Sequence, residues 1–178
     1  KRIRRILYEF FGYLEENIRA YISNKYNKLS DLPEKCVLYL NSHKPEKHVN
    51  NDDIFTNISY LRFKYLLNLS FLLSDSEIDE LFPNLKMKTK ENKIAISDFR
   101  NQISHNKFLL SNRDLHSVNI LGNFHDYSLR SNIINLINFL PKDVGDTIKV
   151  KINKASHRGI DKRKERKRKW ELLSNIVI

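Results

Sequence analysis

The sequence predicts an all-α protein: a bundle of about four to six helices, followed by a small basic C-terminal extension that contains β-structure. Apolar residues recur at three- and four-residue spacing through most of the chain, as on the buried face of an amphipathic helix. The 178 residues are 40% hydrophobic, enough to build a core for one domain. Only 4 glycines and 4 prolines occur, too few for the tight turns of a β-sandwich.

The helices follow from this spacing and from local start and stop signals. The first is the longest, because Ile6, Phe10, Tyr13 or Leu14, Ile18, Tyr21 and Ile22 recur at the spacing of one apolar stripe. Helices are expected over residues 4–28, 34–42, 54–73, 75–82, 95–110 and 129–140. Ser74-Asp75-Ser76 offers an N-cap for the fourth, which stops before Pro83, and Pro141 closes the last.

The pattern changes after Gly145. Ile148, Val150 and Ile152 alternate with lysines, and a period of two predicts a β-strand. Residues 174–178 could supply a partner strand, so the extension is expected to hold a β-hairpin. The expected division is therefore a helical domain over residues 1–145 and a basic extension over residues 146–178.

The excess positive charge lies at the two ends of the chain. The formal net charge is +11, and residues 6–145 carry equal numbers of basic and acidic side chains. Seven of the ten residues 161–170 are basic: Lys162, Arg163, Lys164, Arg166, Lys167, Arg168 and Lys169. Such a run releases counterions from nucleic-acid phosphates, so we expect it to contact RNA; an acidic partner or a solubilising role are the alternatives. Trp170 could stack on a base or anchor the extension against the helices.

Several classes of protein are excluded by what the sequence lacks. A single cysteine, Cys36, rules out an internal disulfide and favours a reducing, cytoplasmic location. The histidines at 43, 48, 116 and 125 lie outside any zinc-ligand spacing, and no glycine-rich phosphate loop occurs. No apolar stretch is long enough to cross a bilayer, so no membrane association is expected. We therefore expect neither a metal nor a cofactor.

The segment that carries chemistry is Asp98-Phe99-Arg100-Asn101-Gln102-Ile103-Ser104-His105. At about 100° per residue, Phe99, Ile103 and Leu110 fall on one stripe of a helix. Arg100, Asn101 and His105 point away from that stripe, with Asn101 and His105 one turn apart. Such a polar face meets either solvent or a partner, and ordinary surface or interface residues are the alternative interpretation.

Arg100-Asn101, followed by three residues and His105, resembles the R-N-x-x-x-H signature of HEPN domains, an all-helical superfamily of ribonucleases. The long first helix and the segment 53–63 are also similar to abortive-infection members, so the resemblance spans about residues 5–140. Many members have a small residue after the histidine, where this chain has Asn106. The family is common in toxin–antitoxin and anti-phage systems.

The resemblance implies metal-independent RNA cleavage at a composite site, where the motif helices of two protomers meet in a homodimer. It assigns His105 as the general acid or base, because histidine titrates near neutral pH. Arg100 would stabilise charge on the phosphate, and Asn101 would orient His105 or hold the phosphate. Glu15 or Glu16 would orient a catalytic group, and Ser104 would be auxiliary.

The sequence thus predicts a dimeric endoribonuclease effector of toxin or antiviral defence type, with RNA as its substrate. An antitoxin or a larger defence complex is a possible partner. The first alternative is a catalytically inactive HEPN module that serves as a dimerisation, sensor or RNA-binding domain of a larger defence protein. The second is a helical scaffold whose basic tail binds an acidic partner.

Overall fold

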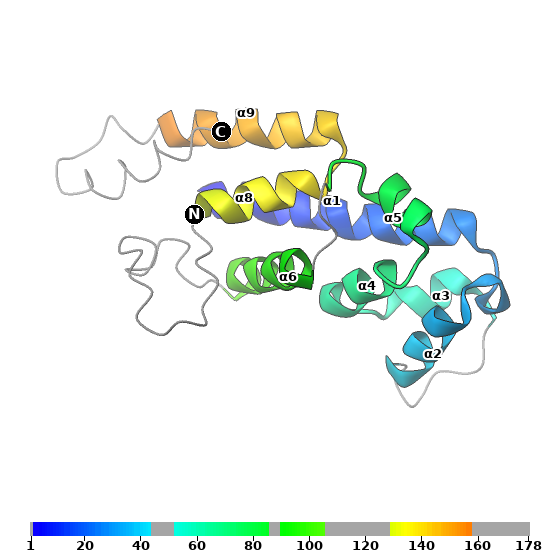
Figure 1. The fold of residues 1–178 in the computed structure, drawn as a ribbon. Coiled ribbons are helices and arrows are strands. Elements are labelled where there is room, and N and C mark those ends of the chain that lie inside the picture. Colours follow the sequence, from blue (N-terminus) through cyan, green and yellow to red (C-terminus); the bar gives the residue numbers. More distant parts are fainter. Residues whose placement is uncertain (1, 44–51, 86–89, 106–128, 158–178) are drawn as a thin grey trace. The chain divides into compact units, whose positions relative to one another are not determined.

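The computed structural model describes residues 2–43, 52–85, 90–105 and 129–157 (Figure 1). These residues contain eight α-helices, a single-turn 3-10 helix (η1) and no β-strand, which confirms the all-α prediction for this part of the chain and exceeds the four to six helices expected. The elements are α1 (Arg2–Lys25), η1 (Leu29–Asp31), α2 (Glu34–His43), α3 (Ile54–Ser59), α4 (Phe63–Ser70), α5 (Asp75–Leu81), α6 (Lys90–Ser104), α8 (Leu129–Asn138) and α9 (Lys142–His157).

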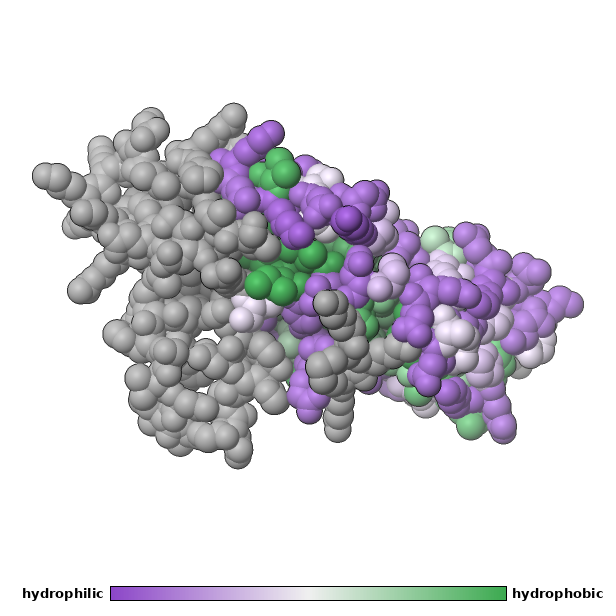
Figure 2. Space-filling model, turned by 45° about the horizontal axis from the view of Figure 1, so that its top comes forward, coloured by the Kyte–Doolittle hydropathy of each residue, from purple (hydrophilic) through white to green (hydrophobic). Residues whose placement is uncertain are grey.

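The chain forms two compact units, which we describe separately. The first unit comprises residues 1–11 and 84–178, and the second comprises residues 12–83. Helix α1 contributes its first turns to the first unit and its remaining turns to the second. On the face shown in Figure 2, most of the described side chains are hydrophilic, and hydrophobic groups are visible in places.

The first unit packs α6, α8, α9 and the start of α1 around a shared apolar core. The rings of Phe11 and Phe99 meet edge to face, with centroids 5.7 Å apart. The Asn84 side chain donates to the Leu140 carbonyl at 2.7 Å, near the turn between α8 and α9. The fully buried side chains include Leu7, Ile96, Phe99, Ile133, Leu136, Phe139, Ile148 and Ile152.

The second unit is built on the long stripe of α1. Leu14, Ile18 and Ile22 are completely buried, as the sequence pattern predicts. Residues of the shorter helices complete the core, among them Cys36, Leu40, Ile58, Leu66, Leu67 and Leu69. The expected helix over residues 54–73 is wrong in one respect, because it is broken into α3 and α4 by the turn at residues 60–62.

The expected β-strand at Ile148–Ile152 is also wrong. These residues lie in α9, so the expected domain boundary between residues 145 and 146 falls inside a helix. Ile148, Ile152 and Ala155 are buried, whereas Val150 is 51% exposed. A strand would place residues 148, 150 and 152 on one face, but only the residues one helical turn apart face the core. The partner strand over residues 174–178 lies outside the described residues.

Candidate functional site

The candidate site lies on α6, on the face that turns away from the core of the first unit. Ala95, Ile96, Phe99 and Ile103 are at most 2% exposed and anchor the helix. Asn101 and His105 are exposed, and Arg100 is half-buried. The predicted core positions Phe99 and Ile103 are therefore confirmed, and Leu110 lies outside the described residues.

The backbone at the end of α6 continues in helical form through the motif. The His105 amide donates to the Asn101 carbonyl at 3.0 Å, so the two side chains sit one turn apart. Ser104 is half-buried, and its hydroxyl oxygen is buried without a hydrogen-bond partner among the described residues. An exposed imidazole one turn from an amide can exchange a proton, and the guanidinium of Arg100 can bind an anion.

The two glutamates expected to assist catalysis belong to the second unit, whereas Arg100, Asn101 and His105 belong to the first. Glu15 forms an ion pair of 2.9 Å with Arg19 on the same helix. Arg19 in turn donates to the carbonyls of Ile58 and Leu61, the latter at 2.8 Å, where α3 ends. Glu15 therefore orients a structural arginine, and Glu16 is exposed.

The basic run expected to contact RNA, from Lys162 to Lys169, lies outside the described residues. Cys36 is fully buried, and its thiol points to the Leu72 carbonyl at 3.5 Å. Burial raises the pKa of Cys36 to about 11, so this thiol stays protonated at neutral pH. It is a core residue of α2.

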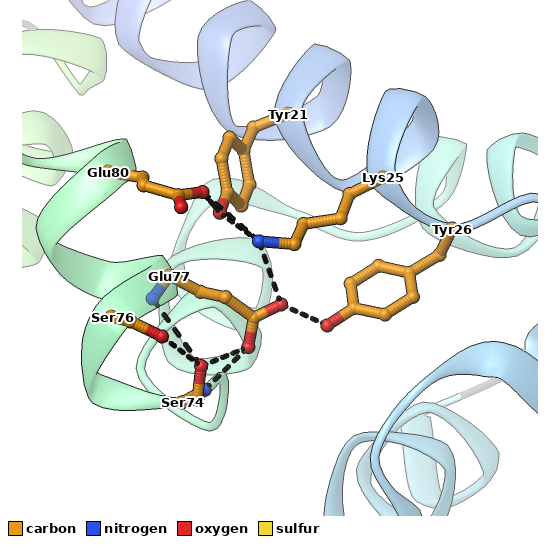
Figure 3. A network of polar contacts seen from close by, with 7 residues as sticks. All are labelled: Tyr21, Lys25, Tyr26, Ser74, Ser76, Glu77 and Glu80. Atoms are coloured by element: carbon orange, nitrogen blue, oxygen red, sulfur yellow. Dashed lines mark hydrogen bonds and ion pairs between the residues drawn. The ribbon is translucent and has the colours of Figure 1, made fainter.

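A polar cluster that sequence reasoning missed joins α1 to α5 in the second unit (Figure 3). Tyr26 donates to Glu77, and the ammonium group of Lys25 lies 3.6 Å from the same carboxylate. Lys25 also pairs with Glu80 at 3.1 Å, and Tyr21 donates to Glu80 at 2.5 Å. The available signal was local: Ser74 and Glu77 have the spacing of a capping box.

Glu77 is the centre of this cluster and is only 6% exposed. The Ser74 hydroxyl and amide donate to it at 2.6 and 2.8 Å. Burial by itself raises the pKa of Glu77, but the hydrogen bonds from Ser74 and Tyr26 together with Lys25 outweigh it and lower the pKa to about 2. The fold therefore favours the charged form of Glu77. We interpret the cluster as a structural contact that holds α5 against α1.

The polar cluster around Glu77 predicts a contribution to the free energy of unfolding that is lost in acid. The Glu77 pKa falls from 4.5 to about 2 on folding, so the stabilisation is complete above pH 4.5 and is lost as the pH falls toward 2. We expect Glu77→Gln to lower the free energy of unfolding at pH 7 by about 1–3 kcal/mol and to flatten its acid dependence. Urea unfolding from pH 7 to pH 3 measures both.

The exposed Glu80 provides the matched control. The Glu80 carboxylate accepts hydrogen bonds from Tyr21 and Lys25 of α1, but its side chain is 58% exposed. Glu80→Gln should therefore lower the free energy of unfolding by less than Glu77→Gln. Equal losses in the two variants would contradict the assignment of Glu77 as the central group.

Comparisons with known proteins give no relative: no family model, no curated protein and no solved structure matches this chain. Among the described residues, no group of histidine, cysteine, aspartate or glutamate side chains is arranged to hold a metal ion. None of the described helices is both long and apolar enough to cross a membrane.

Proposed function

We propose that this chain is a metal-independent endoribonuclease of the HEPN type, acting as a toxin or anti-phage effector. The observation that carries the proposal is the exposure of Asn101 and His105 on a helix whose opposite face is fixed in the core by Phe99 and Ile103. The defence setting follows from the resemblance of the R-N-x-x-x-H segment to HEPN proteins.

The chemistry assigns each side chain a role. The 2′-hydroxyl of RNA attacks the adjacent phosphate, the 5′-oxygen of the next nucleotide leaves, and a 2′,3′-cyclic phosphate remains. His105 transfers a proton in this reaction, because it is exposed and an imidazole can both accept and donate a proton. Arg100 stabilises the charge that develops on the phosphate oxygens, and Asn101 orients His105 or the phosphate.

The proposal includes a homodimer that pairs two copies of α6. Ile94, Asp98, Asn101 and His105 are all exposed, and their spacing of four, three and four residues makes one continuous stripe along the helix. Ile94 is 40% exposed, so pairing would also cover an apolar side chain. One protomer supplies few catalytic groups, and a twofold axis would bring a second copy of each to the site.

We expect sedimentation at micromolar concentration to give the mass of a dimer. Ile94→Arg, at one end of the exposed stripe, should shift the protein toward monomer, because pairing would then bring two like charges together in place of two apolar side chains. Val150 of α9 is 51% exposed and offers a matched control, since Val150→Arg should leave the dimer intact. A wild-type protein that remains monomeric would contradict the composite site.

The test of function is incubation of the purified chain with single-stranded RNA, with and without EDTA. We expect cleavage in both conditions, with products that end in 2′,3′-cyclic phosphate. Loss of activity on chelation would contradict the mechanism. Binding of RNA without cleavage would favour the inactive HEPN module instead.

A further inference from the structure

In the first unit, α1 and α9 run in opposite directions, so that the start of α1 and the end of α9 lie at the same end (Figure 1). Lys151 of α9 contacts Glu9 of α1, and its ammonium group lies 5.1 Å from the centre of the Phe10 ring. These contacts fix the register of the two helices. The charges of Glu9 and Lys151 compensate each other.

One turn beyond this pair the charges are no longer balanced. Arg5 lies four residues before Glu9, and Lys154 lies three residues after Lys151, so both extend toward the same end of the unit. Both side chains are exposed, and neither forms an ion pair with a described carboxylate. The fold thus brings two cations from distant parts of the sequence to the same end of the first unit, and no described carboxylate pairs with either of them.

Helix stability does not account for the charge on α1. The first turn of α1 holds no acidic residue and begins Arg2-Ile3-Arg4-Arg5. Cations at a helix N-terminus oppose the helix dipole, whereas Lys154 near the end of α9 agrees with it. A ligand that carries negative charge would offset the unfavourable placement of Arg5.

An exposed aromatic ring lies one helical turn from Arg5. Tyr8 is 58% exposed and lies one turn from Arg5 on the same side of α1. Cations that follow a backbone together with an exposed ring that can stack on a base are typical of surfaces that bind single-stranded nucleic acid. An acidic protein would also be attracted by the cations, but it has no base that could stack on the Tyr8 ring.

We infer that Arg5, Tyr8 and Lys154 form a binding surface for single-stranded RNA, with Tyr8 stacking on a base and the two cations contacting phosphates. The choice of RNA rests on the proposed function. The last turn of α6 lies at the same end of the first unit (Figure 1), and His105 directly follows this helix in the sequence. RNA bound to this surface would therefore lie at the end of the first unit that also holds the end of α6.

The test measures binding of a labelled single-stranded oligouridylate to the full chain in a His105→Ala background, so that the probe stays intact. We expect Tyr8→Ala to weaken binding by about five-fold or more and Tyr8→Phe to restore it. Tyr13→Ala is the matched control, because Tyr13 lies on the same helix, is 45% exposed and belongs to the other unit. It should bind like the parent protein.

The charges are tested by the dependence of affinity on salt. Arg5→Gln with Lys154→Gln should reduce the log–log slope by up to about 1.4, since each phosphate contact on a single strand contributes roughly 0.7. The control pair Lys64→Gln with Lys142→Gln removes the same charge from exposed positions elsewhere and should leave the slope unchanged.

Three results would overturn the inference: normal binding by Tyr8→Ala, equal slopes in the two double variants, or an equal loss by Tyr8→Ala on duplex RNA, whose bases are already stacked. The readout is binding, so it is separate from catalysis. If Tyr8→Ala weakens binding but the wild-type chain does not cleave RNA, the inference stands and only the ribonuclease proposal fails.

Discussion

Replacing His105 with alanine should abolish RNA cleavage while the fold stays intact. His105 is the group to which the proposed reaction assigns proton transfer, and removal of a general acid or base lowers rates by about 10²–10⁴. The side chain is exposed, so the change in unfolding free energy should stay within about 1 kcal/mol. Cleavage rates with a labelled single-stranded RNA and a thermal unfolding curve measure the two quantities.

The main artefact in this measurement is a contaminating ribonuclease. Lys64→Ala, purified in parallel, is a suitable control because Lys64 is exposed on α4 in the other unit. It should retain full activity. Equal activity in His105→Ala and Lys64→Ala would contradict the catalytic assignment.

Arg100→Lys tests the geometry of the same site. Lysine keeps the positive charge but does not reproduce the two parallel hydrogen bonds that a guanidinium donates to phosphate oxygens. The variant should therefore be strongly impaired in turnover. Activity close to the wild-type level would show that Arg100 acts only as a distant charge.

The sequence pattern of α9 led to a wrong prediction. Ile148 and Ile152 are two strand periods apart and also one helical turn apart, so both patterns explain their burial. The residue that distinguishes the two is Val150, and an apolar side chain there favoured the strand. Its 51% exposure was not predictable, because apolar residues often remain on protein surfaces.

The break between α3 and α4 depends on contacts between distant residues. Arg19 of α1 donates to the carbonyls of Ile58 and Leu61, which are 39 and 42 residues away in the sequence. Periodicity indicates which residues are buried in this segment, and Ile58, Leu66 and Leu69 are indeed buried. It does not identify an arginine from another helix that binds the carbonyls at the turn.

Features of the candidate site that depend on one helix could be predicted from the sequence, and features that depend on contacts between helices could not. The spacing of Phe99 and Ile103 was sufficient to predict that Asn101 and His105 face away from the core, because one helix determines all four directions. The environment of Glu15 depends on Arg19 and on two carbonyls of a different segment. A sequence pattern along one helix could not reveal that its carboxylate already has a structural partner.

Neutralising the basic run should weaken RNA binding and reduce its dependence on salt. The variant changes Lys162, Arg163, Lys164, Arg166, Lys167, Arg168 and Lys169 to glutamine and keeps the chain length. Each phosphate neutralised on a single strand adds roughly 0.7 to the log–log slope, so full engagement would contribute about 4 to 5. We expect the slope to fall by about 2 to 3, because only part of the run contacts phosphates at one time.

The defect should appear in affinity and not in turnover. The proposed catalytic residue Arg100 lies on α6 and His105 directly follows this helix, so cleavage at low salt and saturating RNA should persist in the neutralised protein. Affinity measured at several salt concentrations, with thermal unfolding to check the fold, separates the two effects. An unchanged slope would assign the run to an acidic protein partner or to solubility, because seven cations in contact with phosphates cannot be removed without changing counterion release.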